Sequence, residues 1–483
     1  RGDITWKGVI AMFGFWRVPG KKGDQPPNKF RSCLLPSACL GAPNPDLSNR
    51  FFNGSRLPEN DLAKFDWWNA SGKPESCHSN WGFQETCSGN GTRCRLCSTC
   101  RTGFKRKGVA DCSVCPQEGT NRFLLILGIL AVLIGGMLIV YMSIRAKGVV
   151  EVSEAVKKIS LNYLQVVSIA ALYPMKWPTF VQSFFEAQAA ISSASKSLLS
   201  PACELSYLRA AQAFYQIQVG FAMMPFIIVV LCVVFWLAQS CLSMTGRFCR
   251  DAIRHRRCQL QPHKVTSHTV DCLTLSVVVL LYLAYPTLVK QSMAALACEN
   301  VGDRLWLAAD LEEACYVGTH MAMVLLVSLP QILLYTIGLP LAAFLLLFRN
   351  RKRLDDKQVL FRWGLLYAGF RHEVYWWELS VVVRKVSMIL VGGVFGSHLQ
   401  PDMQVHLALF LIALMVVAHL VMMPFDELTP SHSILQWLEL GSLVMCWLTL
   451  HAGTLFFVGE QEGRMPIEFL NALSAYVVIG NTL

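Results

Sequence analysis

The chain has 483 residues, of which 53% are hydrophobic and 16% are charged, and its mean hydropathy is +0.41. This composition excludes an ordinary soluble globular protein and indicates that much of the chain faces lipid. The net charge of +11 would suit nucleic acid, but the basic residues lie in short blocks beside apolar runs, so no nucleic-acid partner is expected. The sequence opens on Arg1 without a Met or a signal peptide, which indicates that it begins inside a longer protein.

Residues 1–121 are rich in Pro, Gly, Asn and Cys, a composition typical of small loop-rich domains held by disulfides. Three Asn-x-Ser/Thr sequons occur there, at Asn53, Asn69 and Asn90. Nine cysteines lie in the same stretch: Cys33, Cys39, Cys77, Cys87, Cys94, Cys97, Cys100, Cys112 and Cys115. Together they predict an extracellular, N-glycosylated, cysteine-rich domain over residues 1–121.

Nine apolar runs follow and predict a transmembrane helical domain over residues 122–483. Each run reaches or nearly reaches the roughly 20 residues that an α-helix needs to cross the hydrocarbon layer. The runs are Phe123–Ile144, Ile159–Leu172, Tyr207–Leu237, Leu273–Val289, Met321–Phe348, Leu379–Val394, Val405–Met423, Ile434–Val458 and Ile467–Leu483. The expected fold class is mainly α, a polytopic bundle of about nine transmembrane helices with a small disulfide-rich extracellular domain.

The basic residues test this topology, because cytoplasmic loops carry an excess of Lys and Arg. If the N-terminal domain is outside, the predicted inner loops contain the basic blocks at Arg254–Arg257 and Arg349–Arg353, and the outer loops contain few basic residues. The pattern predicts a multi-pass plasma-membrane protein with an extracellular N-terminal domain.

The cysteines beyond residue 121 supply a second test, because disulfides form on the oxidising side of a membrane. Nine N-terminal cysteines are an odd set, and Cys203, Cys298 and Cys315 from the predicted outer loops raise it to twelve. We therefore expect Cys203 to pair with the N-terminal domain and Cys298 to pair with Cys315. The six remaining cysteines fall in predicted spans or inner loops and are expected to stay reduced.

Two Cys-x-x-Cys motifs stand near the end of the N-terminal domain, at Cys97–Cys100 and Cys112–Cys115. This spacing suits a zinc ribbon, but the nearby sequons and the oxidising compartment favour disulfides, so neither a metal nor a cofactor is expected. With Gly103-Phe104 and Pro116, the motifs resemble the ephrin-receptor-like cysteine-rich repeats, here near residues 94–116. That resemblance implies the pairs Cys97–Cys112 and Cys100–Cys115, although four cysteines allow three connectivities.

The most distinctive stretch is Phe361-Arg-Trp-Gly-Leu-Leu-Tyr-Ala-Gly-Phe, followed by Tyr375-Trp-Trp-Glu378 and Arg384-Lys385. It resembles the membrane region of large protist and algal surface proteins that carry ephrin-receptor-like repeats, a region similar to transient-receptor-potential-like channels. Asn162-Tyr-Leu-Gln165 with Trp177-Pro178 and Tyr335-Thr-Ile-Gly-Leu-Pro340 fit the same resemblance. It implies a cation channel assembled from several copies of the chain.

Glu378 and Lys385 are seven residues apart and therefore lie on one face of the predicted sixth span. A charge at that depth faces protein or water, so both are candidates for a gating or ion-pathway contact. The alternative, which we favour, is a structural ion pair or a pair of groups that reach the inner interface. Glu439 in the eighth span is a further candidate, with interhelical hydrogen bonding as an equal alternative.

Pro330, Gly338 and Pro340 interrupt the fifth predicted span. A proline removes a backbone N–H and frees a carbonyl, so kinks are expected there. Each kink is either a gating hinge or, as we favour, a packing feature. The segment Thr179–Ser200 is likewise open to two interpretations, a re-entrant helix or, as we favour, an extracellular helix packed under the cysteine-rich domain.

The sequence has no phosphate-binding Gly loop, zincin helix or Ser nucleophile elbow, so no enzyme is expected. Two functions remain. One is a cation-channel-like surface protein with an extracellular sensing or attachment domain, and the other is a non-conducting cell-surface receptor or anchor. The expected partners are membrane lipids, N-linked glycans, other copies of the chain and extracellular proteins.

Overall fold

The computed structural model describes residues 9–19, 28–42, 44, 75–87, 93–107, 111–145, 152–170, 173, 175, 177–192, 201–205, 207–253, 262–302, 304–395, 399, 401–425, 430–462 and 466–482. The chain folds as two compact units. Unit 1 comprises Arg1–Leu125, Ser200–Ile217 and Ala294–Leu326. Unit 2 comprises Ile126–Leu199, Gln218–Met293 and Val327–Leu483. The cysteine-rich unit therefore also contains two segments from beyond residue 121.

Unit 1 consists of short antiparallel strands. β1 (Phe15–Pro19) pairs with β2 (Asn28–Ser32), β3 (Cys39–Leu40) with β4 (Ser76–Cys77), and β5 (Phe104–Lys107) with β6 (Asp111–Val114), while β7 (Cys298–Val301), β8 (Arg304–Leu307) and β9 (Asp310–Ala314) form a three-stranded sheet. Single turns η2 (Pro36–Ala38), η3 (Ser79–Trp81) and η4 (Arg95–Cys97) and the short helix α6 (Pro201–Glu204) complete it. Cystines fill much of the core, in which Val301 and Leu311 of the three-stranded sheet pack with Val18 and Phe83. Covalent bonds thus support sheets that are too small to bury a large apolar core.

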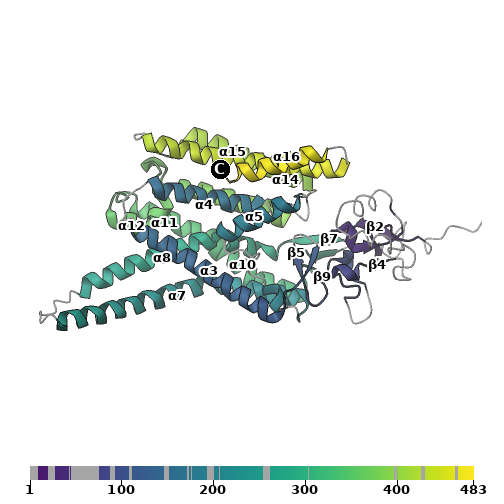
Figure 1. Cartoon of the computed structure of the whole chain (residues 1–483), viewed down its shortest axis with the longest axis horizontal. Coiled ribbons are helices and arrows are strands. Elements are labelled where there is room, and N and C mark those ends of the chain that lie inside the picture. Colours follow the sequence, from purple (N-terminus) through teal and green to yellow (C-terminus); the bar gives the residue numbers. More distant parts are fainter. Residues whose placement is uncertain are drawn as a thin grey trace, which may run out of the picture. The chain divides into compact units, whose positions relative to one another are not determined.

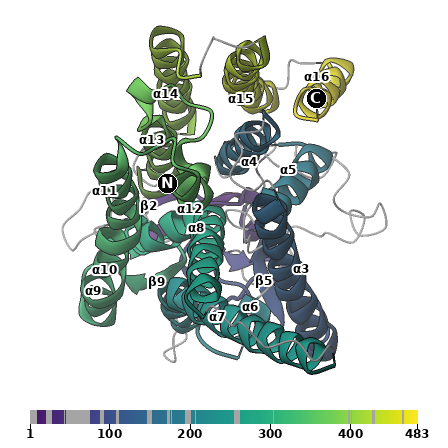
Figure 2. The same ribbon diagram turned by 90° about the vertical axis from the view of Figure 1, so that its left-hand side faces the viewer.

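The helices make up unit 2 and parts of unit 1 (Figures 1 and 2). They are α3 (Glu118–Arg145), α4 (Val152–Ala170), α5 (Thr179–Ser192), α7 (Ala210–Ile253), α8 (Pro262–Ala294), α9 (Gly318–Met323), η5 (Val324–Ser328), α10 (Leu329–Gln331), η6 (Ile332–Gly338), α11 (Leu339–Asn350), α12 (Lys357–Tyr367), η7 (His372–Val374), α13 (Trp377–Ile389), η8 (Leu390–Val394), α14 (Pro401–Met422), α15 (Pro430–Glu462) and α16 (Ile467–Gly480). Some of these residues belong to unit 1: the first turns of α3 and α7, the last residue of α8, all of α9, and residues 324–326 of η5.

Six helices among the described residues are long and apolar enough to cross a membrane: Glu118–Met142, Ala210–Cys241, Thr269–Ala294, Gly318–Asn350, Asp402–Met422 and Ile434–Phe457. They correspond to six of the nine predicted runs. The other three form α4, the α13–η8 helix and α16, which are too short or too polar to meet the same criterion. The structure therefore confirms a mainly helical protein with several helices that could span a membrane. It does not confirm nine spans.

The segment that follows α4 turns back along it. Tyr163 of α4 donates a hydrogen bond to Asn481 Oδ1 (2.8 Å), and Gln188 of α5 donates one to the Asn481 backbone oxygen (3.1 Å). Two residues on opposite arms of the connection therefore meet the same partner, so α4 and α5 form an antiparallel hairpin. Figure 2 shows α4 and α5 side by side.

The turn of this hairpin is buried in the bundle. Tyr173 donates a hydrogen bond to the Met388 backbone oxygen (3.0 Å). A Cβ added at Gly453 would lie 1.7 Å from Met175 Sδ, so this glycine lets α15 approach the turn. Val181 and Phe185 of α5 belong to the same core. The favoured interpretation of residues 179–200, an extracellular helix under the cysteine-rich domain, is therefore wrong for α5, because its apolar face is buried in the helix bundle.

Candidate functional site: a buried ionic network in the helix bundle

Five charged side chains lie almost completely buried inside unit 2. Their exposed fractions are 3% for Lys158, 5% for Glu378, 5% for Arg384, 2% for Lys385 and 3% for Glu439. They come from α4, α13 and α15, three helices that pack on one another. Charged groups are costly to remove from water, so such a concentration needs specific partners inside the bundle.

Lys158 and Glu378 form the first ion pair, between α4 and the start of α13. The Lys158 Nζ lies 3.7 Å from Glu378 Oε2, donates to the Ala368 backbone oxygen (3.0 Å) and lies 3.7 Å from the centre of the Phe370 ring. The other carboxylate oxygen of Glu378 lies 2.9 Å from the Tyr282 hydroxyl of α8. The charge of Lys158 is thus shared by a carboxylate, a carbonyl and an aromatic face.

Asn162 joins this pair to Lys385. Its Oδ1 lies 2.5 Å from the Tyr282 hydroxyl and accepts a hydrogen bond from Lys385 Nζ (2.7 Å). Tyr282 has one hydroxyl proton and faces two acceptors, Asn162 and Glu378, so it satisfies only one of them at a time. Lys158 and Asn162 are four residues apart in α4, which places both on the face that meets α8 and α13.

Arg384 and Glu439 form the second ion pair, between α13 and α15. Arg384 Nη1 lies 3.2 Å from Glu439 Oε1. His419 of α14, which is 0% exposed, donates from Nε2 to the Gln436 backbone oxygen (3.2 Å). Among the described residues, neither Arg384 Nε nor His419 Nδ1 has a hydrogen-bond partner. Buried polar atoms without partners are rare in proteins and mark a place that stores free energy.

The network contains more positive than negative charge. Three cationic side chains, Lys158, Arg384 and Lys385, share two carboxylates. No carboxylate of the described residues lies within 4.0 Å of Lys385 Nζ, which relies on Asn162 and on the Tyr282 ring, whose centre is 5.0 Å away. Because each glutamate already faces a cation, neither is a ligand for a conducted cation in this conformation. An ion-pathway role for Glu378 or Glu439 therefore finds no support in the geometry.

The structure also decides how Glu378 and Lys385 relate to each other. They lie on one side of α13, as their spacing predicts, but they do not pair with each other, and neither reaches the surface. The predicted pair is replaced by contacts to α4 and α8. No role in such a network was predicted from the sequence for Lys158, Asn162, Tyr282 or Arg384. The spacing of Lys158 from Asn162 was the available signal.

Trp377 is likewise part of the network's surroundings. Trp377 is 5% exposed, and its ring centre lies 6.1 Å from that of His419. It belongs to the packed interior, beside His419 of α14.

Pro330, Gly338 and Pro340 lie in one continuous helix, Gly318–Asn350, that contains two π-helical segments, η5 and η6. Pro340 has no N–H for the carbonyl of Thr336, and that oxygen instead accepts a hydrogen bond from the Tyr285 hydroxyl (3.1 Å). Tyr335 donates to the Ala222 backbone oxygen of α7 (2.6 Å). π-Helical segments are frequent at functional sites, so both interpretations of these prolines, hinge and packing, have a structural counterpart.

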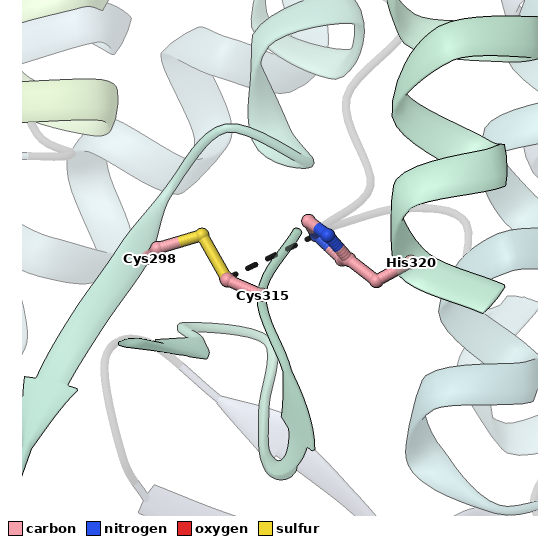
Figure 3. A group of neighbouring side chains, drawn as sticks. All are labelled: Cys298, Cys315 and His320. Atoms are coloured by element: carbon pink, nitrogen blue, oxygen red, sulfur yellow. Dashed lines mark hydrogen bonds between the residues drawn. A yellow bond between two sulfur atoms is a disulfide. The ribbon is translucent and has the colours of Figure 1, made fainter. Parts of the chain in front are cut away.

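In unit 1, Cys298, Cys315 and His320 have ligand atoms within 4.8 Å of one another (Figure 3). The two sulfurs form a disulfide, and both ring nitrogens of His320 are used: Nδ1 accepts from Tyr316 N (2.9 Å) and Nε2 donates to the Ala295 oxygen (3.1 Å). The donor set is therefore fully occupied within the protein and does not fit a metal ion.

The described residues form six disulfides: Cys33–Cys39, Cys77–Cys97, Cys87–Cys94, Cys100–Cys112, Cys115–Cys203 and Cys298–Cys315. Cys203 does bond to the N-terminal segment and Cys298 to Cys315. The pairs implied by the ephrin-receptor-like resemblance, Cys97–Cys112 and Cys100–Cys115, are wrong, because Cys97 bonds to Cys77 and Cys112 to Cys100. Cys232 and Cys446 are free thiols. The sequon residues Asn53, Asn69 and Asn90 lie outside the described residues.

No family model and no solved structure matches the chain. The chain is similar to Cysteine repeat modular protein A of Toxoplasma gondii, with 24% identity over 433 residues that cover 78% of this chain. The chain spans 14% of that protein's length. The similarity, the six apolar helices and the disulfide-rich unit agree on a membrane or surface protein. None of the comparisons supports the resemblance to transient-receptor-potential-like channels.

Proposed function

We propose that the chain is the membrane region of a multi-pass surface protein that works as a transient-receptor-potential-like cation channel, with the disulfide-rich unit as an extracellular sensing or attachment part. The observation that carries the proposal is the buried network of five charged side chains. Buried ion pairs contribute little net stability, so helices that only anchor a protein gain nothing from them. A bundle that changes conformation does, because ionic contacts can exchange partners.

In this proposal the network sets the conformation of the bundle and does not conduct. Its excess positive charge would repel cations, whereas Lys385, which has no carboxylate partner among the described residues, is available to a different arrangement of α13. The helix Gly318–Asn350 has only 22% of its apolar window buried and contains the π-helical segments. We place the conducting path along this helix, between copies of the chain in a symmetric homo-oligomer.

Reconstitution of the purified protein into planar bilayers tests the proposal. The wild-type protein is expected to pass cations, and Glu439→Gln is expected to change the open probability without changing cation selectivity, because Glu439 sits in the network and not in the path. Glu373→Gln is the matched control, since that side chain is 83% exposed and its distance to Arg371 is 3.9 Å. Its currents are expected to equal those of the wild type.

A non-conducting receptor or anchor is the second candidate, and one observation favours it. The similar Toxoplasma protein continues far beyond the region that this chain matches, so a membrane region that bears large extracellular modules is a consistent reading. Bilayers that remain silent with folded, disulfide-bonded protein would reject the channel and support the anchor. A monomer in detergent would point the same way, because the proposed path lies between copies.

A further inference from the structure

Unit 1 contains a cavity of about 210 Å³ that the proposed function does not use. The residues that decide its chemistry are Trp16 of β1, Arg95 of η4, and Gly302, Arg304 and Trp306 of the β7–β8 hairpin. Two indole rings, two guanidinium groups and an exposed glycine backbone thus converge on one hollow. No acidic side chain of the described residues lines it.

Arg95 is held rigidly in this cavity. Its guanidinium lies 3.6 Å from the centre of the Trp306 ring and pairs with Glu312, while its backbone N donates to Glu312 Oε1 (2.7 Å). Disulfides at Cys94 and Cys97 fix the turn on both sides. Leu96 and Cys97 have φ values of 51° and 48°, which is unusual for residues with a side chain. The fold therefore pre-organises one wall of the cavity.

Trp306 and Arg304 complete the wall from the hairpin. The Trp306 indole donates from Nε1 to the Val301 oxygen (3.1 Å), which fixes the orientation of the ring. Arg304 is exposed, and no carboxylate of the described residues lies within 4.0 Å of its guanidinium. Because Glu312 neutralises Arg95 and no described carboxylate pairs with Arg304, the described lining of the cavity carries a net positive charge.

We propose that this cavity binds one anionic sugar unit of a glycan, a ring that carries a carboxylate or a sulfate group. A pyranose ring has an apolar C–H face that packs against an indole, and Trp16 offers that surface, while the Trp306 ring is stacked with Arg95. The guanidinium of Arg304 matches a carboxylate or sulfate with two parallel hydrogen bonds. The volume is below the roughly 300–1,000 Å³ of pockets for drug-sized ligands, so it suits a single ring.

An acidic peptide is the competing ligand, and the cavity favours the sugar over it. A carboxylate side chain would meet Arg304 but would leave the apolar face of the Trp16 indole uncovered. The inference is independent of whether the membrane region conducts, because every residue that lines the cavity belongs to unit 1. Failure of the bilayer experiment and failure of this one are therefore distinguishable.

The test uses the full chain in detergent micelles, with glucuronic acid, glucose 6-sulfate and glucose as probes. Tryptophan fluorescence and saturation-transfer NMR measure binding. We expect saturable binding of both anionic sugars and at least tenfold weaker binding of glucose. Arg304→Gln is expected to weaken the binding of both anionic sugars about tenfold, and Arg304→Lys is expected to weaken it less. Neither variant should change the binding of glucose. Arg101→Gln, another exposed arginine of unit 1 that does not line the cavity, is the matched control.

Thermal unfolding of each variant establishes that unit 1 remains folded. This is expected because Arg304 is exposed and has no ion pair with a described residue. Glucose that binds as tightly as glucuronic acid would overturn the proposal. Equal affinities in Arg304→Gln and Arg101→Gln would do the same. Binding of a triglutamate peptide in the absence of any sugar binding would identify the cavity as an acidic-peptide site and would also reject the proposal.

Discussion

Replacing Glu439 by Gln breaks the ion pair with Arg384 while keeping the size of the side chain. The two side chains are 4% and 6% exposed and 3.2 Å apart, so the remaining Arg384 charge has no water to replace its partner. Removal of one partner from a buried pair costs about 3–5 kcal/mol of unfolding free energy. Glu439→Gln also increases the excess positive charge of the network, whereas Arg384→Gln removes that excess. We therefore expect Glu439→Gln to destabilise more than Arg384→Gln.

A double-mutant cycle measures this coupling. Wild type, Glu439→Gln, Arg384→Gln and the double variant are unfolded in detergent by heat or denaturant, with Glu373→Gln as the exposed control. The double variant is expected to be more stable than Glu439→Gln, because two amides leave no unpaired charge. Glu373→Gln should change stability by no more than about 0.5 kcal/mol. Additive single effects, or a Glu439→Gln effect as small as that of the control, would refute the reasoning.

Three further predictions concern other parts of the molecule. Lys385→Met should lower the free energy of unfolding less than Lys158→Met, because only Lys158→Met leaves a buried carboxylate, Glu378, without its cation. Thermal unfolding in detergent compares the two variants. A larger loss in Lys385→Met would contradict the assigned pairs. Gly453→Ala should destabilise the protein by about 1–3 kcal/mol, because a Cβ at this position meets Met175 and Trp177. Gly441→Ala is the control, because a Cβ there meets nothing within 4 Å. Equal melting temperatures of the two variants would reject the close approach of α15 to the turn. Non-reducing peptide mapping should recover Cys77 linked to Cys97 and Cys115 linked to Cys203, and recovery of Cys97 linked to Cys112 would show the pairing to be wrong.

The features that depend on a single segment could be predicted from the sequence. A long apolar run has to form a helix wherever lipid surrounds it, because every backbone polar group needs an internal partner. Six runs behave in that way. The pair Cys298–Cys315 was also predictable, since both cysteines lie in one short segment between two predicted spans and close a local sheet.

The features that depend on contacts between distant segments could not be predicted. Lys385 meets Asn162 across 223 positions, and Tyr282 meets Glu378 across 96. Periodicity along one helix places a charge on a face but does not identify the helix opposite. The α4–α5 hairpin was missed for a similar reason: the polar residues of α4, Lys158 and Asn162, meet partners on α8 and α13 that the periodicity of α4 does not identify.

The disulfides near residues 94–116 show where a local resemblance fails. Four cysteines at two regular spacings look like a closed repeat, but Cys97 bonds to Cys77 and Cys115 to Cys203, so two of the four pair outside the repeat. The strand pairing explains part of this, because β5 and β6 set Arg106 opposite Cys112 and bring Cys112 near Cys100. The spacing of cysteines within the repeat does not predict that Cys77 and Cys203 are the partners outside it.

We predict that lipid surrounds the apolar helices and that the disulfide-rich unit lies on the oxidising side of the membrane. Glycan and disulfide mapping in sealed, right-side-out vesicles measures this directly, with a protease that cannot enter them. We expect sugar at Asn53, Asn69 or Asn90 and intact Cys298–Cys315 on the protease-accessible side, with the Arg349–Arg353 block protected. Glycans or disulfides on the same side as that basic block, or release of the whole chain into the soluble fraction without detergent, would contradict the account.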